Sequence, residues 1–325
     1  MNGRVGLFGR RDLLLLILLI FLVIVGLSGL VMATGWREVW ASLGAVSVMQ
    51  IGALLGLTIC NFTLRSLRWH MFARSLAIPV SLWINIRLYF AGLLMIATPA
   101  RVGELVRLRW LGRESGQPLE VTSPMVVLDR ASDLLAIGAL LLLCLAAGSG
   151  ISGALPAAAF TLVVAFMVTR PLLFEALLKL VWRAVGRWPR LFVKARRAAK
   201  SLAVFSRPSV LVATLGLGGL GWFAEGVSFW LLLNWMGADI DLWAAVAIFA
   251  LSMLTGGATG MPGGLGGAEM ALVTLLSMQG VALEIAAPAT ALIRLTTLWF
   301  AIAIGFVISP VVEKASRKAL DAVEK

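Results

Sequence analysis

The sequence has one histidine, two cysteines and one tyrosine in 325 residues. Cys60 and Cys144 both lie inside apolar runs, so a disulfide framework is not expected. Because His70 is the single histidine, the chain lacks the cysteine and histidine spacing of a metal site. The sequence therefore predicts no metal and no other cofactor.

Charged residues are also scarce, at 14% of the chain, whereas 60% of the residues are hydrophobic. This balance, with a mean hydropathy of +0.97, is incompatible with an ordinary soluble domain and predicts an all-α polytopic membrane protein. Residues 1–325 are expected to form a single membrane domain, because no polar stretch is long enough to bury a separate core. The net charge of +12 comes from basic residues in short loops, which anionic lipid headgroups explain without nucleic acid.

Apolar runs predict about six full transmembrane helices. They are expected at 13–33, 43–63, 123–147, 154–169, 211–235 and 287–309. The first run is too long for the apolar part of a signal peptide and is expected to remain as a span. The distribution of lysine and arginine predicts a multi-pass protein with both termini in the cytoplasm. The expected location is the cytoplasmic (inner) membrane of a bacterium or archaeon.

An interrupted apolar segment stands at 83–110. Pro99 favours a break in the helix at Thr98, and Arg101 and Glu104 follow at once. A break inside hydrocarbon is tolerated only where the freed backbone groups are buried in protein or line a water-filled cavity. Both ends of the segment are basic, so it is predicted to be a re-entrant, broken helical hairpin on the cytoplasmic side, beside a cavity.

A second interrupted segment, at 243–281, contains Pro262, a glycine cluster and Glu269. No lysine or arginine occurs from 236 to 286, which places this hairpin on the external side. The glycines lack the lysine and hydroxyl of a nucleotide-binding loop. Close helix packing is an alternative reason for them.

The two halves of the chain correspond. Glu104 is followed by Arg130, and Glu269 by Arg294, at nearly equal separations. Interrupted segments in corresponding positions of two halves indicate an inverted-topology internal repeat with a site between the halves. The predicted repeats are 43–147 and 211–309. If each hairpin crossed fully as two spans, the count would be ten, and the sequence leaves both possibilities open.

The stretch 170–207 is strongly basic, with Glu175 as its single acidic residue. Apolar and basic clusters alternate near the helical period, which predicts amphipathic helices on the cytoplasmic leaflet. A helix that binds a protein partner is the alternative.

Four motifs resemble one known family. They are RSLRW at 65–69, TPARVGELVR at 98–107, VLDRASDLL at 127–135 and MPGGLGGAE at 261–269. They are similar to the flippase-like integral membrane family that shares the membrane domain of lysylphosphatidylglycerol synthase. The resemblance covers about 43–309 and implies a stand-alone member without the aminoacyltransferase domain. It implies translocation of a lipid and not the aminoacyl-transfer reaction.

The candidate substrate-binding residues lie around the two interruptions and on the neighbouring spans. They are Pro99, Arg101, Gly103, Glu104, Arg130, Glu225, Pro262, Gly263, Gly264, Gly266, Glu269 and Arg294. The arginines can present a guanidinium fork to a phosphate, and restarted helices can point their N-termini into the same cavity. The two glutamates of the hairpins can balance the arginines in the empty state, or take a proton if transport is coupled. No catalytic residue is expected.

Simpler roles exist for several of these side chains. Asp129 and Asp133 are close enough to neutralise Arg130 within one helix. Glu104 has Arg101 and Arg107 three residues away on either side. A lone carboxylate inside a membrane needs a partner or a proton, and Arg294 is the natural partner for Glu225.

The function predicted first is a lipid flippase or transporter, not an enzyme. It would move an anionic or isoprenoid-type polar lipid between leaflets by alternating access. An intramembrane enzyme that modifies lipid headgroups is the second possibility, although its acid–base groups would have to be carboxylates alone. A scaffold subunit of a lipid or polymer synthesis complex is the third. The expected partners are membrane lipids with anionic headgroups and a lipid synthase or glycosyltransferase.

Overall fold

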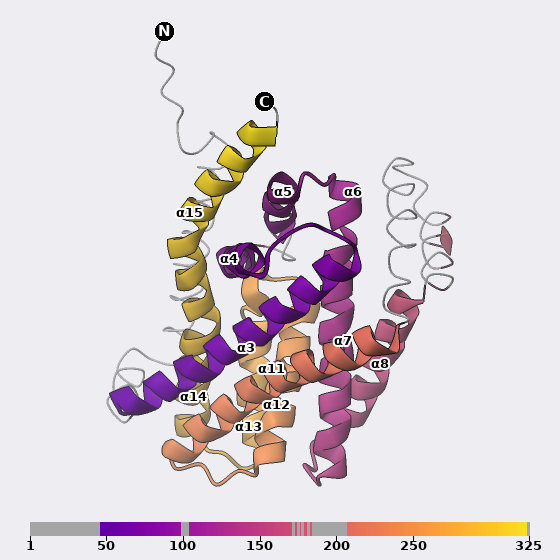
Figure 1. Ribbon diagram of the computed structural model, residues 1–325. Helices are drawn as coiled ribbons and strands as arrows, with labels where there is room; N and C mark the ends of the chain where they lie inside the picture. Colours follow the sequence, from indigo (N-terminus) through magenta and orange to yellow (C-terminus); the bar gives the residue numbers. More distant parts are fainter. Residues whose placement is uncertain are drawn as a thin grey trace.

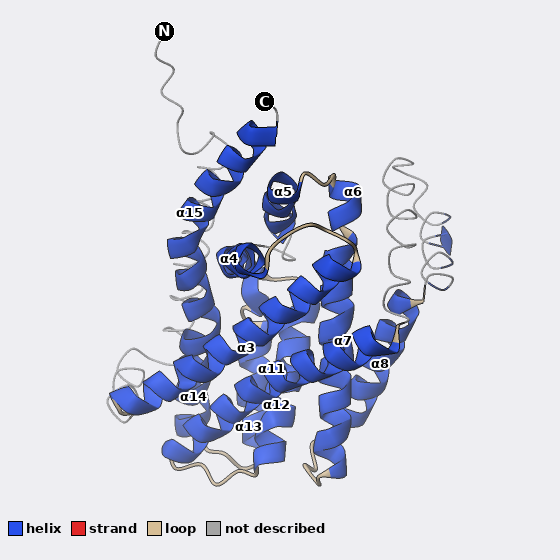
Figure 2. Ribbon diagram, in the orientation of Figure 1, coloured by secondary structure: helices blue, strands red, loops and turns tan. Residues whose placement is uncertain are grey.

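A computed structural model describes residues 46–98, 104–170 and 207–323, with a few single helical positions between 173 and 183. Within these ranges every regular element is a helix, which confirms the predicted all-α class (Figure 2). The predicted first span at 13–33 lies outside the described residues. So do Pro99, Arg101, Gly103 and most of the basic stretch.

Three helices of the described ranges are long and apolar enough to cross a membrane. They are α3 (Val48–Ser75), α11 (Pro208–Trp235) and the continuous helix Leu283–Leu320. The last one consists of α14 (Leu283–Arg294), the π-helical turn η5 (Leu295–Trp299) and most of α15 (Phe300–Val323). It continues well beyond Ser309, where the sequence predicted the span to end.

Two helix pairs repeat the same local design. α3 is followed by α4 (Leu82–Gly92), and α11 by α12 (Leu242–Ala258). Both long helices have 28 residues, and both reverse through a residue in the left-handed region, Ala77 (φ 56°) or Gly237 (φ 84°). The next helix then begins at a side-chain cap, since Ser81 and Asp241 each accept a hydrogen bond from the backbone of the first turn. The two pairs therefore share one local sequence of elements, a 28-residue helix, a left-handed reversal and a capped shorter helix.

The long helices α3 and α11 pack side by side and antiparallel (Figure 1). Arg68 contacts α11 at Gly218 near its start, whereas Asn61 meets Gly221 and then Glu225 further along. A Cβ at Gly218 would lie 2.8 Å from Arg68 Nη1, and one at Gly221 would lie 2.5 Å from Asn61 Oδ1. Glycine at both positions leaves room for these two side chains of α3, so the helices approach closely here.

Each half contains an interrupted hairpin. In the first, α4 tightens into the 3₁₀ turn η1 (Leu93–Ala97), Thr98 is extended, and α5 is described from Glu104 to Ser115. This confirms the predicted break at Thr98. In the second, α12 leads through η4 (Pro262–Gly264) to α13 (Gly267–Met278).

A short helix, α6 (Leu119–Thr122), connects α5 to α7 (Pro124–Ala146), which pairs with α8 (Ala154–Thr169). These bounds agree closely with the predicted spans at 123–147 and 154–169. Helix α7 buries its charged side chains against α3. The apolar cores on either side hold these helices in place and so position the charges.

Candidate functional site

A fully buried ion-pair network joins α3 and α7. Arg68 Nη2 lies 2.6 Å from Asp129 Oδ1 and 2.8 Å from Asp133 Oδ1, and Arg65 Nη2 lies 2.5 Å from Asp133 Oδ2. The arginines are three residues apart and the aspartates four, so each pair occupies one face of its helix. Charges in an apolar bundle are stable only when paired in this way.

This network corrects one prediction. The sequence predicts that the second span ends near residue 63 and that Arg65 and Arg68 belong to the basic, cytoplasmic end that follows it. Both lie inside α3 and are buried. The missed signal was the match between two stripes of opposite charge, Arg-x-x-Arg on one helix and Asp-x-x-x-Asp on another.

Arg130 connects this network to the first hairpin. Its Nη2 lies 2.8 Å from Asp129 and 3.2 Å from Glu104, and its Nη1 lies 3.6 Å from Asp133. The alternative in which the aspartates of α7 neutralise it is confirmed, with Glu104 as a further partner. Its side chain is 34% exposed whereas its carboxylate partners are buried, so Arg130 forms the accessible edge of the network.

Arg107 does not pair with Glu104, so this half of the predicted alternative is wrong, whereas its other half, a pair with Arg101, lies outside the described residues. The guanidinium of Arg107 lies between two aromatic rings, 4.7 Å from the centroid of Trp69 and 4.5 Å from that of Tyr89. Gly92 makes room for it, since a Cβ there would overlap the guanidinium. Stacking on ring faces stabilises a cation without a carboxylate. No pattern in the sequence indicates this arrangement.

The second half contains the matching pair. Arg294 is 4% exposed, and its Nε donates a 2.6 Å hydrogen bond to Glu269 Oε1. Its Nη2 donates to the backbone oxygen of Gly263 at 2.6 Å. Both predicted Glu–Arg correspondences are therefore direct contacts, and the glutamates do balance the arginines. Glu269 also lies in the first turn of α13, where a negative charge is favourable.

Glu225 has a different partner from the one predicted. Asn61 Nδ2 donates a 2.5 Å hydrogen bond to its Oε1. The expected ion pair with Arg294 is wrong, because that guanidinium is turned toward Glu269 and Gly263. The amide on the neighbouring helix α3 is the group that reaches the carboxylate.

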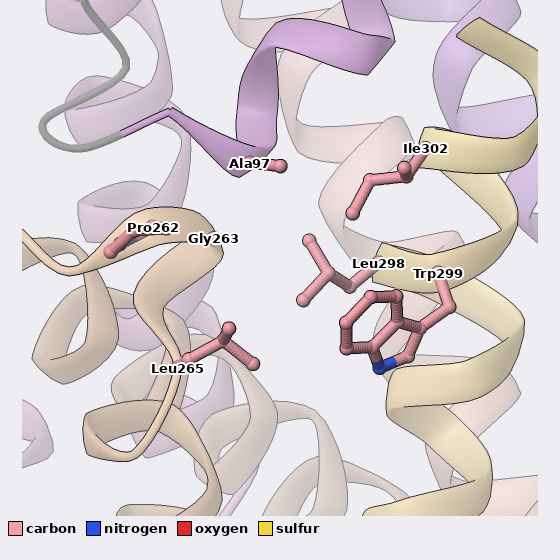
Figure 3. A pocket seen from close by; sticks show the side chains of 7 residues that line it. All are labelled: Ala97, Pro262, Gly263, Leu265, Leu298, Trp299 and Ile302. Atoms are coloured by element: carbon pink, nitrogen blue, oxygen red, sulfur yellow. The ribbon is translucent and has the colours of Figure 1, made fainter. Parts of the chain in front are cut away.

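The two hairpin tips meet at a small recess (Figure 3). It is lined by Ala97, Pro262, Gly263, Leu265, Leu298, Trp299 and Ile302. A cavity was predicted at this junction, but as a polar one. The recess is apolar because apolar residues line it, and the hydrogen bond from Arg294 to Gly263 holds the second tip beside it.

The remaining predicted glycines shape the second tip. Gly263, Gly264 and Gly266 all have φ between 60° and 81°, in the left-handed region that favours glycine. Gly264 also packs against Gly256, where a Cβ would approach the backbone to 3.0 Å. The tip is therefore a tight turn that directs a carbonyl oxygen toward Arg294.

Sequence comparison shows the family of the chain. The profile of the family described as the lysylphosphatidylglycerol synthase TM region matches residues 13–305. The chain belongs to this family. A further relative of this membrane family is a UPF0104 membrane protein of Methanothermobacter thermautotrophicus, which is 26% identical over 323 residues, 90% of this chain and 94% of the relative. Family membership and the long apolar helices together indicate a multi-pass membrane protein.

Proposed function

We propose that the chain is a lipid flippase or transporter that moves an anionic or isoprenoid-type polar lipid between membrane leaflets. The observation that carries the proposal is the pair of buried Glu–Arg contacts, Glu104 with Arg130 and Glu269 with Arg294, one beside each hairpin. A lipid phosphate competes for the same guanidinium groups through bidentate, charge-assisted hydrogen bonds. When no headgroup is bound, the two glutamate carboxylates take the place of the phosphate and neutralise the arginines.

The recess between the hairpin tips is too small for a lipid chain, and it marks the place where the two tips meet. Its lining is entirely apolar, and Arg294 donates to Gly263, one of the lining residues. A headgroup that takes Arg294 from its present partners loosens the second tip from the recess. In this mechanism substrate binding itself releases the second hairpin tip, so binding and hairpin movement are coupled.

The proposed topology is an inverted repeat with about six full spans and two re-entrant hairpins. Antiparallel packing of α3 against α11 supports it, because inversion of one half relative to the other requires equivalent helices to run in opposite directions. The distribution of basic residues supports both termini in the cytoplasm. The proposed location is the cytoplasmic membrane of a bacterium or archaeon.

The test is translocation in reconstituted vesicles. Fluorescent phosphatidylglycerol is placed in both leaflets, and a membrane-impermeant quencher reports how fast the inner population reaches the outer leaflet. We expect Arg294→Gln and Arg130→Gln to slow this exchange about tenfold or more, since each removes a charge-assisted contact worth about 1.4 kcal/mol or more. Arg113→Gln is the matched control, because Arg113 pairs with Glu313 away from the network.

Two results count against the proposal. If wild-type protein moves neither phosphatidylglycerol nor an isoprenoid phosphate faster than empty vesicles, the transport function is wrong. If both arginine variants transport at the wild-type rate, the site is wrong. Mass spectrometry of the same vesicles tests the non-enzymatic part of the proposal, since a chemically modified headgroup would favour the intramembrane enzyme instead. Stable co-purification with a lipid synthase or glycosyltransferase is expected if such a partner supplies the substrate.

A further inference from the structure

The crossing of α3 and α11 contains a carboxyl group with an incomplete set of partners. Glu225 is 6% exposed and accepts its hydrogen bond from Asn61 Nδ2, an uncharged donor. Asn61 is fully buried, and its own Oδ1 has no hydrogen-bond donor. The side chain that contacts the Glu225 carboxyl group therefore also contains a buried acceptor, Asn61 Oδ1, that has no donor.

The charged side chains around Glu225 are all engaged elsewhere. On α3, Arg65 binds Asp133 and Arg68 binds Asp129 and Asp133, the two aspartates being on α7. On α14, Arg294 binds Glu269. The face of α12 that is buried here consists of apolar and small side chains. Among the described residues, Glu225 thus has no salt bridge, which is unfavourable for an ionised carboxylate in an apolar bundle.

We propose that Glu225 is a proton-binding site, that Asn61 positions the proton, and that this proton is the ion coupled to transport. In the protonated form the carboxyl O–H donates to Asn61 Oδ1 while Asn61 Nδ2 donates to the other carboxyl oxygen. Two hydrogen bonds then satisfy both side chains, and no buried charge remains. The coupling role rests on the proposed transport function, whereas proton binding itself does not.

A route to proton release lies one helical turn away. The guanidinium of Arg65 lies 5.3 Å from the ring centroid of Trp222, three residues before Glu225 on α11. Arg65 and Glu225 also occupy corresponding positions in the two 28-residue helices. When Arg65 leaves Asp133 for Glu225, the carboxyl O–H bond breaks, the proton passes to water, and an Arg65–Glu225 ion pair forms. Asp133 keeps Arg68 as its partner.

Infrared difference spectroscopy tests the proton site directly, on the full-length protein in lipid vesicles. We expect the carbonyl band of a buried carboxylic acid at neutral pH in the wild type, absent in Glu225→Gln and shifted in Asn61→Ala, which removes the amide. Glu313→Gln is the control and keeps the band, because Glu313 is ion-paired with Arg113 and Arg317. Glu225→Asp is a second variant, which retains a carboxyl group and is expected to keep a displaced band.

The outcomes separate this inference from the transport function. The proton site is overturned if the wild type shows no carboxylic-acid band, or if its band persists in Glu225→Gln. This holds even if lipid is transported. A band that depends on Glu225, in protein that moves no lipid, supports the proton site and overturns the transport function. In transporting vesicles, we expect a pH-sensitive dye to record proton movement with lipid in the wild type and none in Glu225→Gln. Equal proton movement in both overturns the coupling.

Discussion

Arg68 and Asp129 form an ion pair of 2.6 Å in which neither side chain has any exposed surface. Removal of one partner leaves an uncompensated charge inside an apolar bundle, which destabilises proteins by about 3–5 kcal/mol. We predict a loss of this size for Arg68→Met, measured by thermal unfolding in detergent.

Arg317→Ala is the comparison for that variant. Arg317 pairs with Glu313 at the surface, and its side chain is 40% exposed. Exposed pairs contribute about 0.2–1 kcal/mol, so the unfolding temperature of this variant should barely change. Similar losses in the two variants would show that the buried network does not stabilise the fold.

Helix α15 passes the first hairpin tip at Gly305. A Cβ at this position would lie 2.1 Å from the backbone nitrogen of Leu94, in η1. Gly305→Ala is therefore expected to push α15 away from the tip and to cost about 1–3 kcal/mol of unfolding free energy. Gly52→Ala, in α3, has nothing within 4 Å of the new Cβ and should be neutral or slightly stabilising. Equal effects would contradict the close packing of α15 on η1.

Glycine is favoured at position 263 for two reasons, its left-handed backbone conformation and the lack of space for a Cβ. The cost of each to stability can be measured separately. The φ of Gly263 is 60°, and a Cβ would lie 2.8 Å from Leu298 Cδ1. Gly260 has φ 66° with open space around its Cβ position. Gly260→Ala should cost only the left-handed strain of about 1–2 kcal/mol, and Gly263→Ala about 1–3 kcal/mol more. Parallel unfolding measurements and the translocation assay check the difference, and a milder effect at Gly263 would contradict it.

The contribution of Arg107 to the stability of the fold should depend on the two aromatic rings that enclose its guanidinium. Tyr89→Leu removes one aromatic face at 4.5 Å from the guanidinium, and we expect a loss of about 2 kcal/mol or more in unfolding free energy. Tyr89→Phe keeps the ring and should lose clearly less. If Phe and Leu are equally damaging at this position, the stacking does not stabilise the cation.

Glu269 is predicted to compete with the substrate for Arg294. In Glu269→Gln the arginine loses its 2.6 Å ionic partner, so an anionic lipid should bind about tenfold more tightly, for a difference of about 1.4 kcal/mol. Because release is then slower, lipid retained after purification should rise while the translocation rate falls. Met253→Leu, which removes only a weak sulfur contact with Arg294, is the control. Unchanged retention in Glu269→Gln would indicate that the headgroup binds elsewhere.

The sequence by itself determined the class of the protein, the break at Thr98 and the turn at Pro262. These features are local, because proline and glycine act on the backbone next to them and helical spacing assigns side chains to a face. The tertiary structure decided which faces meet. It buried Arg65 and Arg68 against α7, gave Glu225 an amide in place of Arg294, and enclosed Arg107 between aromatic rings. Partner choice depends on which helices pack together and in which direction, and no periodicity within one helix contains that information.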